Sequence, residues 1–176
     1  MLSAKILPTQ DDWDRIAGWV QPKIVLLNVQ ARDCTHALEI AATAAAQARR
    51  QDPAPWFRAL QRREQAGSTA LGCAVAIPHA RVAGLAEPMT VFLRPSSALH
   101  FGAPAEEAVS QLLVILVPPS DARDEHLQLL AIVAQLFATP GVRKRLLAAP
   151  TVDAVTQVFR EGLAEVHLGV SSEASA

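Results

Sequence analysis

Residues 112 to 117 read LLVILV, six large apolar side chains in succession. A run this short, with no polar side, is typical of a strand that is covered on both faces. Other stretches with the branched, apolar makeup of strands are KIVLLNV at 23–29, LGCAVAI at 71–77, MTVFL at 89–93 and a brief LHF at 99–101. We therefore expect a sheet covered by helices rather than a helix bundle or a β-sandwich.

Helical patterns flank these strands. Residues 35–50 are rich in alanine and follow the candidate N-caps Asp33 and Thr35, whereas residues 52–67 open with the candidate N-cap Asp52 and end in Gly67. From about residue 124 apolar side chains recur at the spacing of one buried helix face: Leu127, Leu130, Ala131, Ala134 and Phe137. Two shorter helices are expected near 142–149 and 151–162.

Together these elements predict an α/β fold. We expect a single domain over residues 22–165, with a mixed β-sheet of about four to five strands flanked by helices on both faces. Residues 1–21 are interpreted as an N-terminal extension docked on the domain, and residues 166–176 as a flexible C-terminal tail.

Composition narrows the class of partner. With 16 basic and 17 acidic residues the formal net charge is −1, so no broad field attracts nucleic acid or an anionic membrane. Cys34 and Cys73 are far apart and form no Cys-x-x-Cys pattern, which fits a reducing compartment. The first residues lack the apolar stretch of a secretory signal, and LLVILV is too short to span a bilayer. We expect a cytoplasmic protein without membrane insertion.

The segment AIPHAR at 76–81 contains the first candidate site residue, His79. It follows a strand and a proline, at the kind of sheet end where open α/β folds bind ligands. Imidazole near neutral pH is a nucleophile that can accept a phosphoryl group on nitrogen and pass it on. A solitary histidine is also common as a structural residue, so the segment alone leaves both interpretations open.

Two more segments carry side chains suited to phosphate. In RDEHLQLLA, His126 lies in the first turn of a predicted helix, where unpaired backbone amides favour an anion and a neutral ring. In RREQAGSTALG, Arg63 ends a helix and is followed by the hydroxyls of Ser68 and Thr69. Arg62 is expected to point elsewhere, because neighbouring helical side chains diverge.

The two blocks LQRREQAGSTALGCAVAIPHAR (60–81) and LLVILVPPSDARDEHLQLLAIVAQLF (112–137) occur in a specific order. With these two blocks the chain resembles the enzyme IIA domain of the fructose and mannitol class of the bacterial phosphotransferase system. Within that class the likeness is greatest to the free-standing nitrogen-regulatory branch. The likeness covers roughly residues 22–163. Ala80 stands where many members have glycine, which concerns the backbone of the loop rather than the chemistry.

The resemblance implies a phosphocarrier with a regulatory role rather than one in sugar uptake. His79 would accept a phosphoryl group from the phosphohistidine of HPr or its nitrogen-branch relative, His126 would support the site, and Arg63 would lie beside the phosphoryl group. Ser68 and Thr69 match the hydroxyl pair of the family. No cofactor or metal is implied. Expected partners are an HPr-like phosphocarrier protein and regulatory targets such as potassium transport or sensor kinase proteins.

Two alternatives remain at this point. The first is a module of the same fold that is never phosphorylated and acts only by docking. The second is a metal-dependent hydrolase using His79, His126 and Cys73, which the absence of an acidic ligand cluster disfavours. Residues outside the motifs are interpreted as structural: His36, His100, His167, Trp56 and Phe57.

Overall fold

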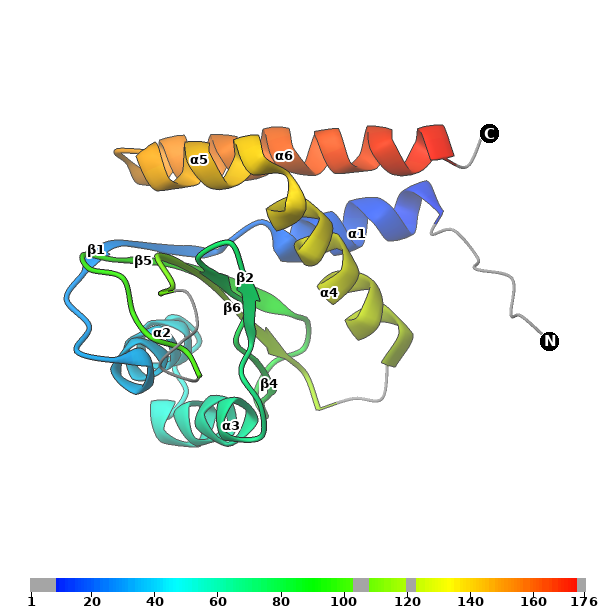
Figure 1. Ribbon diagram of the computed structural model, residues 1–176. Helices are drawn as coiled ribbons and strands as arrows, with labels where there is room; N and C mark the ends of the chain where they lie inside the picture. Colours follow the sequence, from blue (N-terminus) through cyan, green and yellow to red (C-terminus); the bar gives the residue numbers. More distant parts are fainter. Residues whose placement is uncertain (1–8, 103–107, 120–122, 174–176) are drawn as a thin grey trace.

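The computed structural model describes residues 9–102, 108–119 and 123–173 (Figure 1). The strands are β1 (Ile24–Val29), β2 (Ala70–Gly72), β3 (Val75–Ala76), β4 (His79–Arg81), β5 (Met89–Pro95) and β6 (Gln111–Val117). The helices are α1 (Gln10–Val20), α2 (Cys34–Ala48), α3 (Pro53–Gln65), α4 (Arg123–Ala138), α5 (Pro140–Ala148) and α6 (Val152–Glu173).

Strand β6 is the centre of the sheet, whose order is β1-β5-β6-β3-β2 with β4 also paired to β6. It runs antiparallel to β5 and parallel to β3 and β4, while β1 and β5 are parallel. All seven residues of β6 are buried. The predicted α/β fold with a mixed sheet is therefore confirmed, with six strand segments where four to five were expected.

The alternation of side chains along β6 divides the interior into two cores. Leu112, Val114 and Leu116 pack in one core with buried residues of α2 and α3. Leu113, Ile115 and Val117 pack in the other with residues of α1, α4, α5 and α6. Figure 1 shows the same division, with α2 and α3 on one face of the sheet and the remaining helices on the other.

The predicted strand at 71–77 is wrong in its extent. The chain turns back between β2 and β3 at Cys73 and Ala74, whose φ angles are 54° and 60°. Tight hairpin turns of this hand usually contain glycine or asparagine, so the apolar pair gave no turn signal. After the turn, residues 75–81 follow β6 on one side, interrupted at Ile77 and Pro78.

Helix α4 is present as predicted, but the face predicted to be buried was wrong. Five positions were expected in the core. Three of them are exposed (Leu127, Ala131 and Ala134), Leu130 is half-buried, and only Phe137 is buried. The buried side chains are Leu129, Ile132, Val133, Leu136 and Phe137. The helix is apolar on more than one side, so the three-and-four spacing alone does not select the face that contacts the sheet.

The two ends of the described chain are helical. In α1, Trp13, Ile16 and Val20 are buried in the core beside α4. Helix α6 continues to Glu173 instead of ending at residue 162, and Val166 within it is 8% exposed. Residues 166–173, expected in a flexible tail, therefore belong to a helix, and the predicted domain limits of 22 and 165 stay a prediction.

A buried cation joins the sheet to the end of α5. Arg94 of β5 is 9% exposed, and its Nη1 donates to the carbonyl oxygens of Leu146 (3.0 Å), Leu147 (3.0 Å) and Ala149 (2.6 Å). These carbonyls lie at the end of α5, where they have no partner within the helix and where the helix dipole favours a positive charge. The guanidinium thereby caps α5 from inside the protein.

We expect Arg94→Met to lower the free energy of unfolding by about 2–4 kcal/mol, because it leaves several buried carbonyls without a donor. Arg58→Met is the control, since Arg58 is exposed on α3 and its replacement should change stability by less than about 0.5 kcal/mol. Urea unfolding followed by circular dichroism measures both variants. Equal stabilities for the two would show that Arg94 is not a structural cap.

Candidate functional site

His79 is the first residue of β4, at the edge of the sheet rather than beyond the end of a strand. It pairs with Ile115 of β6, whose backbone amide donates to the carbonyl of Pro78 at 2.8 Å. The next residue, Ala80, is buried and pairs with Leu116 of β6, so the backbone on either side of His79 is fixed to β6. Because β4 pairs only with β6 among the described strands, its outer edge faces α3.

The two ring nitrogens of His79 have different partners. Nδ1 lies 2.9 Å from the carbonyl oxygen of Ile77, which can only accept, so this nitrogen carries the proton in the neutral ring. Nε2 then holds the lone pair, and it accepts a hydrogen bond of 3.3 Å from Nε of Arg63. The nucleophilic nitrogen of His79 is therefore Nε2.

Arg63 is fixed in the last turn of α3. Its Nη1 donates to the carbonyl oxygen of Gly67 at 2.9 Å, which anchors the guanidinium across the end of the helix. The side chain is half-buried and directs Nε toward His79. A guanidinium in this place offers further N–H groups to an anion bound on the ring.

His126 lies in the first turn of α4 and faces His79. The ring centroids are 5.7 Å apart and the planes are inclined by 52°. Nδ1 of His126 is buried and has no hydrogen-bond partner among the described residues. The two histidines of the sequence motifs therefore come together, and one nitrogen of the second has capacity for a further partner.

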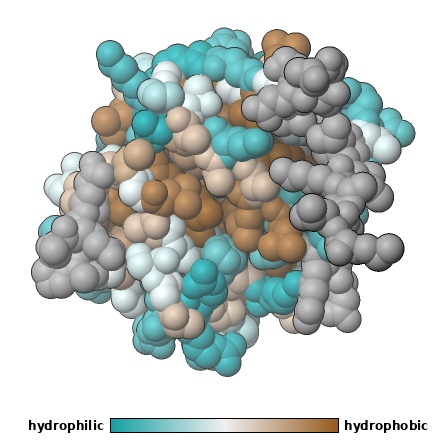
Figure 2. All heavy atoms as spheres, turned by 45° about the vertical axis from the view of Figure 1, so that its right-hand side comes forward, coloured by the Kyte–Doolittle hydropathy of each residue, from teal (hydrophilic) through white to brown (hydrophobic). Residues whose placement is uncertain are grey.

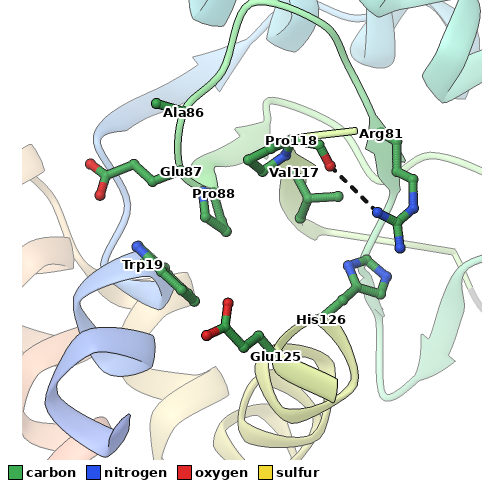
Figure 3. Close-up of a pocket in the computed structure, with 9 residues that line it drawn as sticks. All are labelled: Trp19, Arg81, Ala86, Glu87, Pro88, Val117, Pro118, Glu125 and His126. Carbon is green, nitrogen blue, oxygen red and sulfur yellow. Dashed lines mark hydrogen bonds between the residues drawn. The ribbon is translucent and has the colours of Figure 1, made fainter. Parts of the chain in front are cut away.

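A cavity of about 400 Å³ contains these groups. It is lined by Ala59, Arg62, Arg63, His79, Ala80, Arg81 and His126. A smaller pocket of about 90 Å³ adjoins it, shares Arg81 and His126, and is closed by Trp19, Pro88 and Pro118 (Figure 3). Arg62, which we expected to point away, therefore lines the same cavity as Arg63. Arg81 also lines it, although no motif in the sequence marked this residue.

Ser68 and Thr69 lie outside the lining of this cavity. Thr69 is buried, and its backbone amide and Oγ1 donate to the carboxylate of Glu64 at 3.0 and 2.5 Å. Ser68 is exposed, accepts from the amide of Ala70 at 3.2 Å and lines a separate pocket beside Cys34. The role predicted for the two hydroxyls stays a prediction. Glu64, which no sequence motif marked as a site residue, holds the turn that leads to β2 through these two bonds.

Burial and nearby cations favour the neutral form of both histidines. Burial lowers the pKa of His79 below its ordinary value of 6.5, and the charge of Arg63 lowers it further against the opposing effects of Ile77 and Glu64. Burial also lowers the pKa of His126, with contributions from His79 and Arg81. A neutral ring is the nucleophilic form of histidine, so the surroundings favour the reactive state.

The described residues offer little support for the metal-dependent hydrolase. Within ranges 9–102, 108–119 and 123–173, no three histidine, cysteine, aspartate or glutamate side chains gather as metal ligands would. Cys73, proposed as a third ligand, lies on the exposed hairpin turn. Over the same ranges no helix combines the length and apolar character that a bilayer crossing requires.

The chain is similar to known proteins over most of its length. Residues 19–162 match a family model described as phosphoenolpyruvate-dependent sugar phosphotransferase system, EIIA 2. A nitrogen regulatory protein of Pseudomonas aeruginosa is 39% identical over 102 residues, which are 58% of this chain and 66% of that protein. One from Bradyrhizobium diazoefficiens is 30% identical over 144 residues, covering 82% of this chain and 94% of that protein.

A solved structure agrees with these sequence matches. The crystal structure of nitrogen regulatory protein IIA-Ntr from Neisseria meningitidis has a TM-score of 0.70 and 32% identity to this chain. The match covers 77% of this chain and 92% of that one.

The rings of His79 and His126 are expected to titrate with midpoints below 6.5, because burial disfavours their charged form. The unfolded chain binds these two protons at higher pH than the folded chain, so the free energy of unfolding should fall as pH drops through 6.5. Proton–carbon NMR of the ring signals from pH 4 to 8 measures the midpoints, with the urea-unfolded chain as reference. Midpoints at or above the unfolded reference would contradict this electrostatic account.

Proposed function

We propose that this chain, which belongs to the EIIA 2 family of the phosphoenolpyruvate-dependent sugar phosphotransferase system, is a regulatory phosphocarrier that takes a phosphoryl group on His79. The family resemblance expected from the sequence is confirmed. The observation that carries the proposal is the hydrogen bond from Nδ1 of His79 to the Ile77 carbonyl, which leaves Nε2 as a nucleophile beside Arg63.

The transfer needs a nucleophile, an open approach and a place for charge. A donor phosphohistidine enters the cavity with phosphorus in line with Nε2 of His79. The bond from the donor nitrogen to phosphorus breaks and leaves its electron pair on the donor ring, while the bond from phosphorus to Nε2 forms. The Nδ1 proton of His79 stays in place, and the Ile77 carbonyl stabilises the positive charge that develops on the ring.

Fixed donors around the cavity stabilise the three phosphoryl oxygens. The Arg63 guanidinium exchanges its bond to Nε2 for a bond to an oxygen, and Arg62 and Arg81 add positive charge at the cavity wall. His126 reaches the same space from the first turn of α4, where helix amides and the dipole favour an anion. These groups are in place before the phosphoryl group arrives, so little reorganisation accompanies the transfer.

The surface beside the cavity is suited to a protein donor. Leu127 follows His126 on α4 and is 63% exposed, and the exposed Ala131 and Ala134 continue the same side of the helix. Figure 2 shows, for one face of the whole molecule, that apolar side chains gather between hydrophilic borders. We propose that an HPr-like phosphocarrier protein, from the general or the nitrogen branch of the system, docks on the exposed side of α4 beside the cavity. We also propose that the protein works in the cytoplasm, together with such a carrier.

Phosphorylation supplies the regulatory signal. A phosphoryl group adds about two negative charges to a cavity lined by three arginines, so it offsets most of the positive charge that a docking partner meets there. We propose that targets distinguish the two forms on this basis. Potassium transport and sensor kinase proteins are candidate targets from the family resemblance.

Ser68 and Thr69 lie outside the cavity, so their position favours a role in shaping the turn before β2 over direct contact with phosphate.

The first experiment tests phosphorylation. The full chain is incubated with phosphoenolpyruvate, enzyme I and an HPr-like carrier, and its intact mass is followed. We expect the wild type to gain one phosphate and His79→Ala to gain none, because Nε2 of His79 is the proposed acceptor, with its lone pair beside Arg63. His100→Ala, which changes an exposed histidine outside the site, is the control and should be labelled like the wild type. An unlabelled wild type would favour the docking-only module.

The second experiment separates two neighbouring arginines. Arg63→Met should slow transfer to His79 by about 10- to 100-fold, because it removes a fixed donor that stabilises the phosphoryl oxygens. Arg62→Met is the matched control: it removes a charge from the same cavity but no hydrogen bond to His79, and we expect less than about a fivefold effect. Rapid-quench measurement of the transfer rate compares them. Equal transfer rates for the two variants would contradict the proposal that Arg63 stabilises the phosphoryl oxygens.

A further inference from the structure

Helix α1 lies almost entirely before residue 19, where the family match begins, yet it contacts α4, the helix that carries His126. We propose that Arg15 of this helix is a positioning residue, which holds the first turn of α4 through Glu125 and thereby fixes the His126 ring against His79. The expected effect on the rate of phosphoryl transfer rests on the proposed function of the site. The structural part of the inference is independent of phosphorylation.

Arg15 stands on a well-anchored helix. Trp13, Ile16 and Val20 of α1 are buried in the core that α4 also joins. At the end of α1, Oγ1 of the buried Thr90 lies 3.2 Å from the carbonyl oxygen of Trp19 and 3.1 Å from that of Val20, and donates to them. An ion pair made from this helix therefore has one fixed end.

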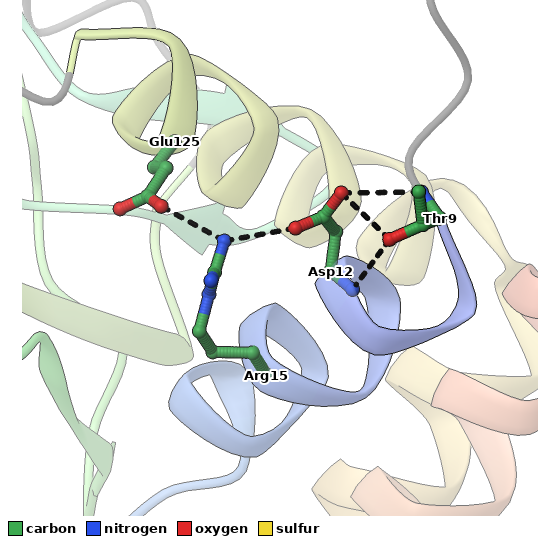
Figure 4. A network of polar contacts seen from close by, with 4 residues as sticks. All are labelled: Thr9, Asp12, Arg15 and Glu125. Atoms are coloured by element: carbon green, nitrogen blue, oxygen red, sulfur yellow. Dashed lines mark hydrogen bonds and ion pairs between the residues drawn. The ribbon is translucent and has the colours of Figure 1, made fainter.

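The Arg15 guanidinium connects the two helices (Figure 4). Its Nη2 is 3.0 Å from Oδ1 of Asp12 and 2.8 Å from Oε1 of Glu125. Asp12 is itself held in a capping box with Thr9, and hydrogen bonds from Thr9 lower the pKa of this carboxyl. Cζ of Arg15 also lies 5.6 Å from the ring centroid of Trp19. Three contacts, to Asp12, Glu125 and Trp19, thus orient the Arg15 side chain where α1 meets α4.

Glu125 is the residue before His126, so its position affects the ring directly. Both residues belong to the first turn of α4, the part of a helix that frays most readily. Glu125, His126 and Trp19 line the same small pocket (Figure 3). A tether on Glu125 therefore restrains the turn that carries His126, from outside the cavity in which transfer takes place.

Positioning matters because the ring has few restraints of its own. Nδ1 of His126 has no hydrogen-bond partner among the described residues, and its ring meets His79 at a centroid distance of 5.7 Å. Reactions at prepared sites are sensitive to displacements of about 1 Å. Loss of the tether would let the first turn of α4 move without exposing the buried residues of the helix.

The test uses the full chain with Arg15→Met, Arg15→Lys and Glu125→Gln. Arg145→Met is the matched control, because Arg145 also makes two exposed ion pairs, at 2.9 Å to Glu161 and at 2.9 Å to Glu165, between α5 and α6. Two quantities are measured: the nuclear Overhauser effect between the ring protons of His79 and His126, and the limiting rate and half-saturation of transfer from the phosphorylated carrier.

We expect Arg15→Met to weaken the ring-to-ring signal and to lower the limiting rate by about two- to fivefold, the range open to an exposed ion pair, with half-saturation unchanged. Arg15→Lys should retain at least half of the rate. Combining Arg15→Met with Glu125→Gln should cost no more than either change alone. Melting temperatures of Arg15→Met and Arg145→Met should be similar.

The inference would be overturned if Arg15→Met and Arg145→Met showed the same ring-to-ring signal and the same limiting rate. An effect confined to half-saturation would also overturn it, because it would assign Arg15 to docking. If the wild type is never labelled, it is the proposed function that fails. The ring-to-ring signal then still decides whether Arg15 positions His126.

Discussion

The burial of β6 on both faces is the constraint on which the rest of the structure depends. Leu112, Val114 and Leu116 pack toward α2 and α3, and the residues between them pack toward α1, α4 and α6. Each fully buried leucine or isoleucine contributes about 1.5–3 kcal/mol, and a register shift of one residue would exchange the two sets of neighbours. The register of β4 on β6 is fixed in the same way, and with it the position of His79.

Because β4 is held at the sheet edge, groups from three different elements converge on one imidazole. The link between β3 and β4 supplies the Ile77 carbonyl, which determines the tautomer, α3 supplies Arg63, and α4 supplies His126. Burial and the surrounding cations disfavour a protonated ring, and the same cations favour an added phosphoryl group. The surroundings that make the free histidine nucleophilic therefore also stabilise the phosphorylated product.

The sequence predicted what depends on local pattern and missed what depends on three-dimensional context. The strand LLVILV and the caps Asp33 and Asp52 follow from short segments with strong physical signals. The same kind of signal made His79, His126 and Arg63 separate candidates, and the family resemblance joined them into one site. The hairpin at Cys73 carries no glycine or asparagine within the turn pair, and the buried face of α4 cannot be read from a helix that is apolar on two sides. Arg62 and Arg81 line one cavity only because α3 and β4 meet there, and Arg15 reaches Glu125 only because α1 packs beside α4.

The central claim is that the Ile77 carbonyl holds the Nδ1 proton of His79 and leaves Nε2 as the phosphoryl acceptor. Phosphorus–nitrogen couplings in a 15N-labelled, phosphorylated sample identify the bonded ring nitrogen directly. The account predicts a bond from phosphorus to Nε2, with Nδ1 still protonated. A bond to Nδ1 would mean that the observed tautomer does not direct the reaction, and the account would be wrong at its first step.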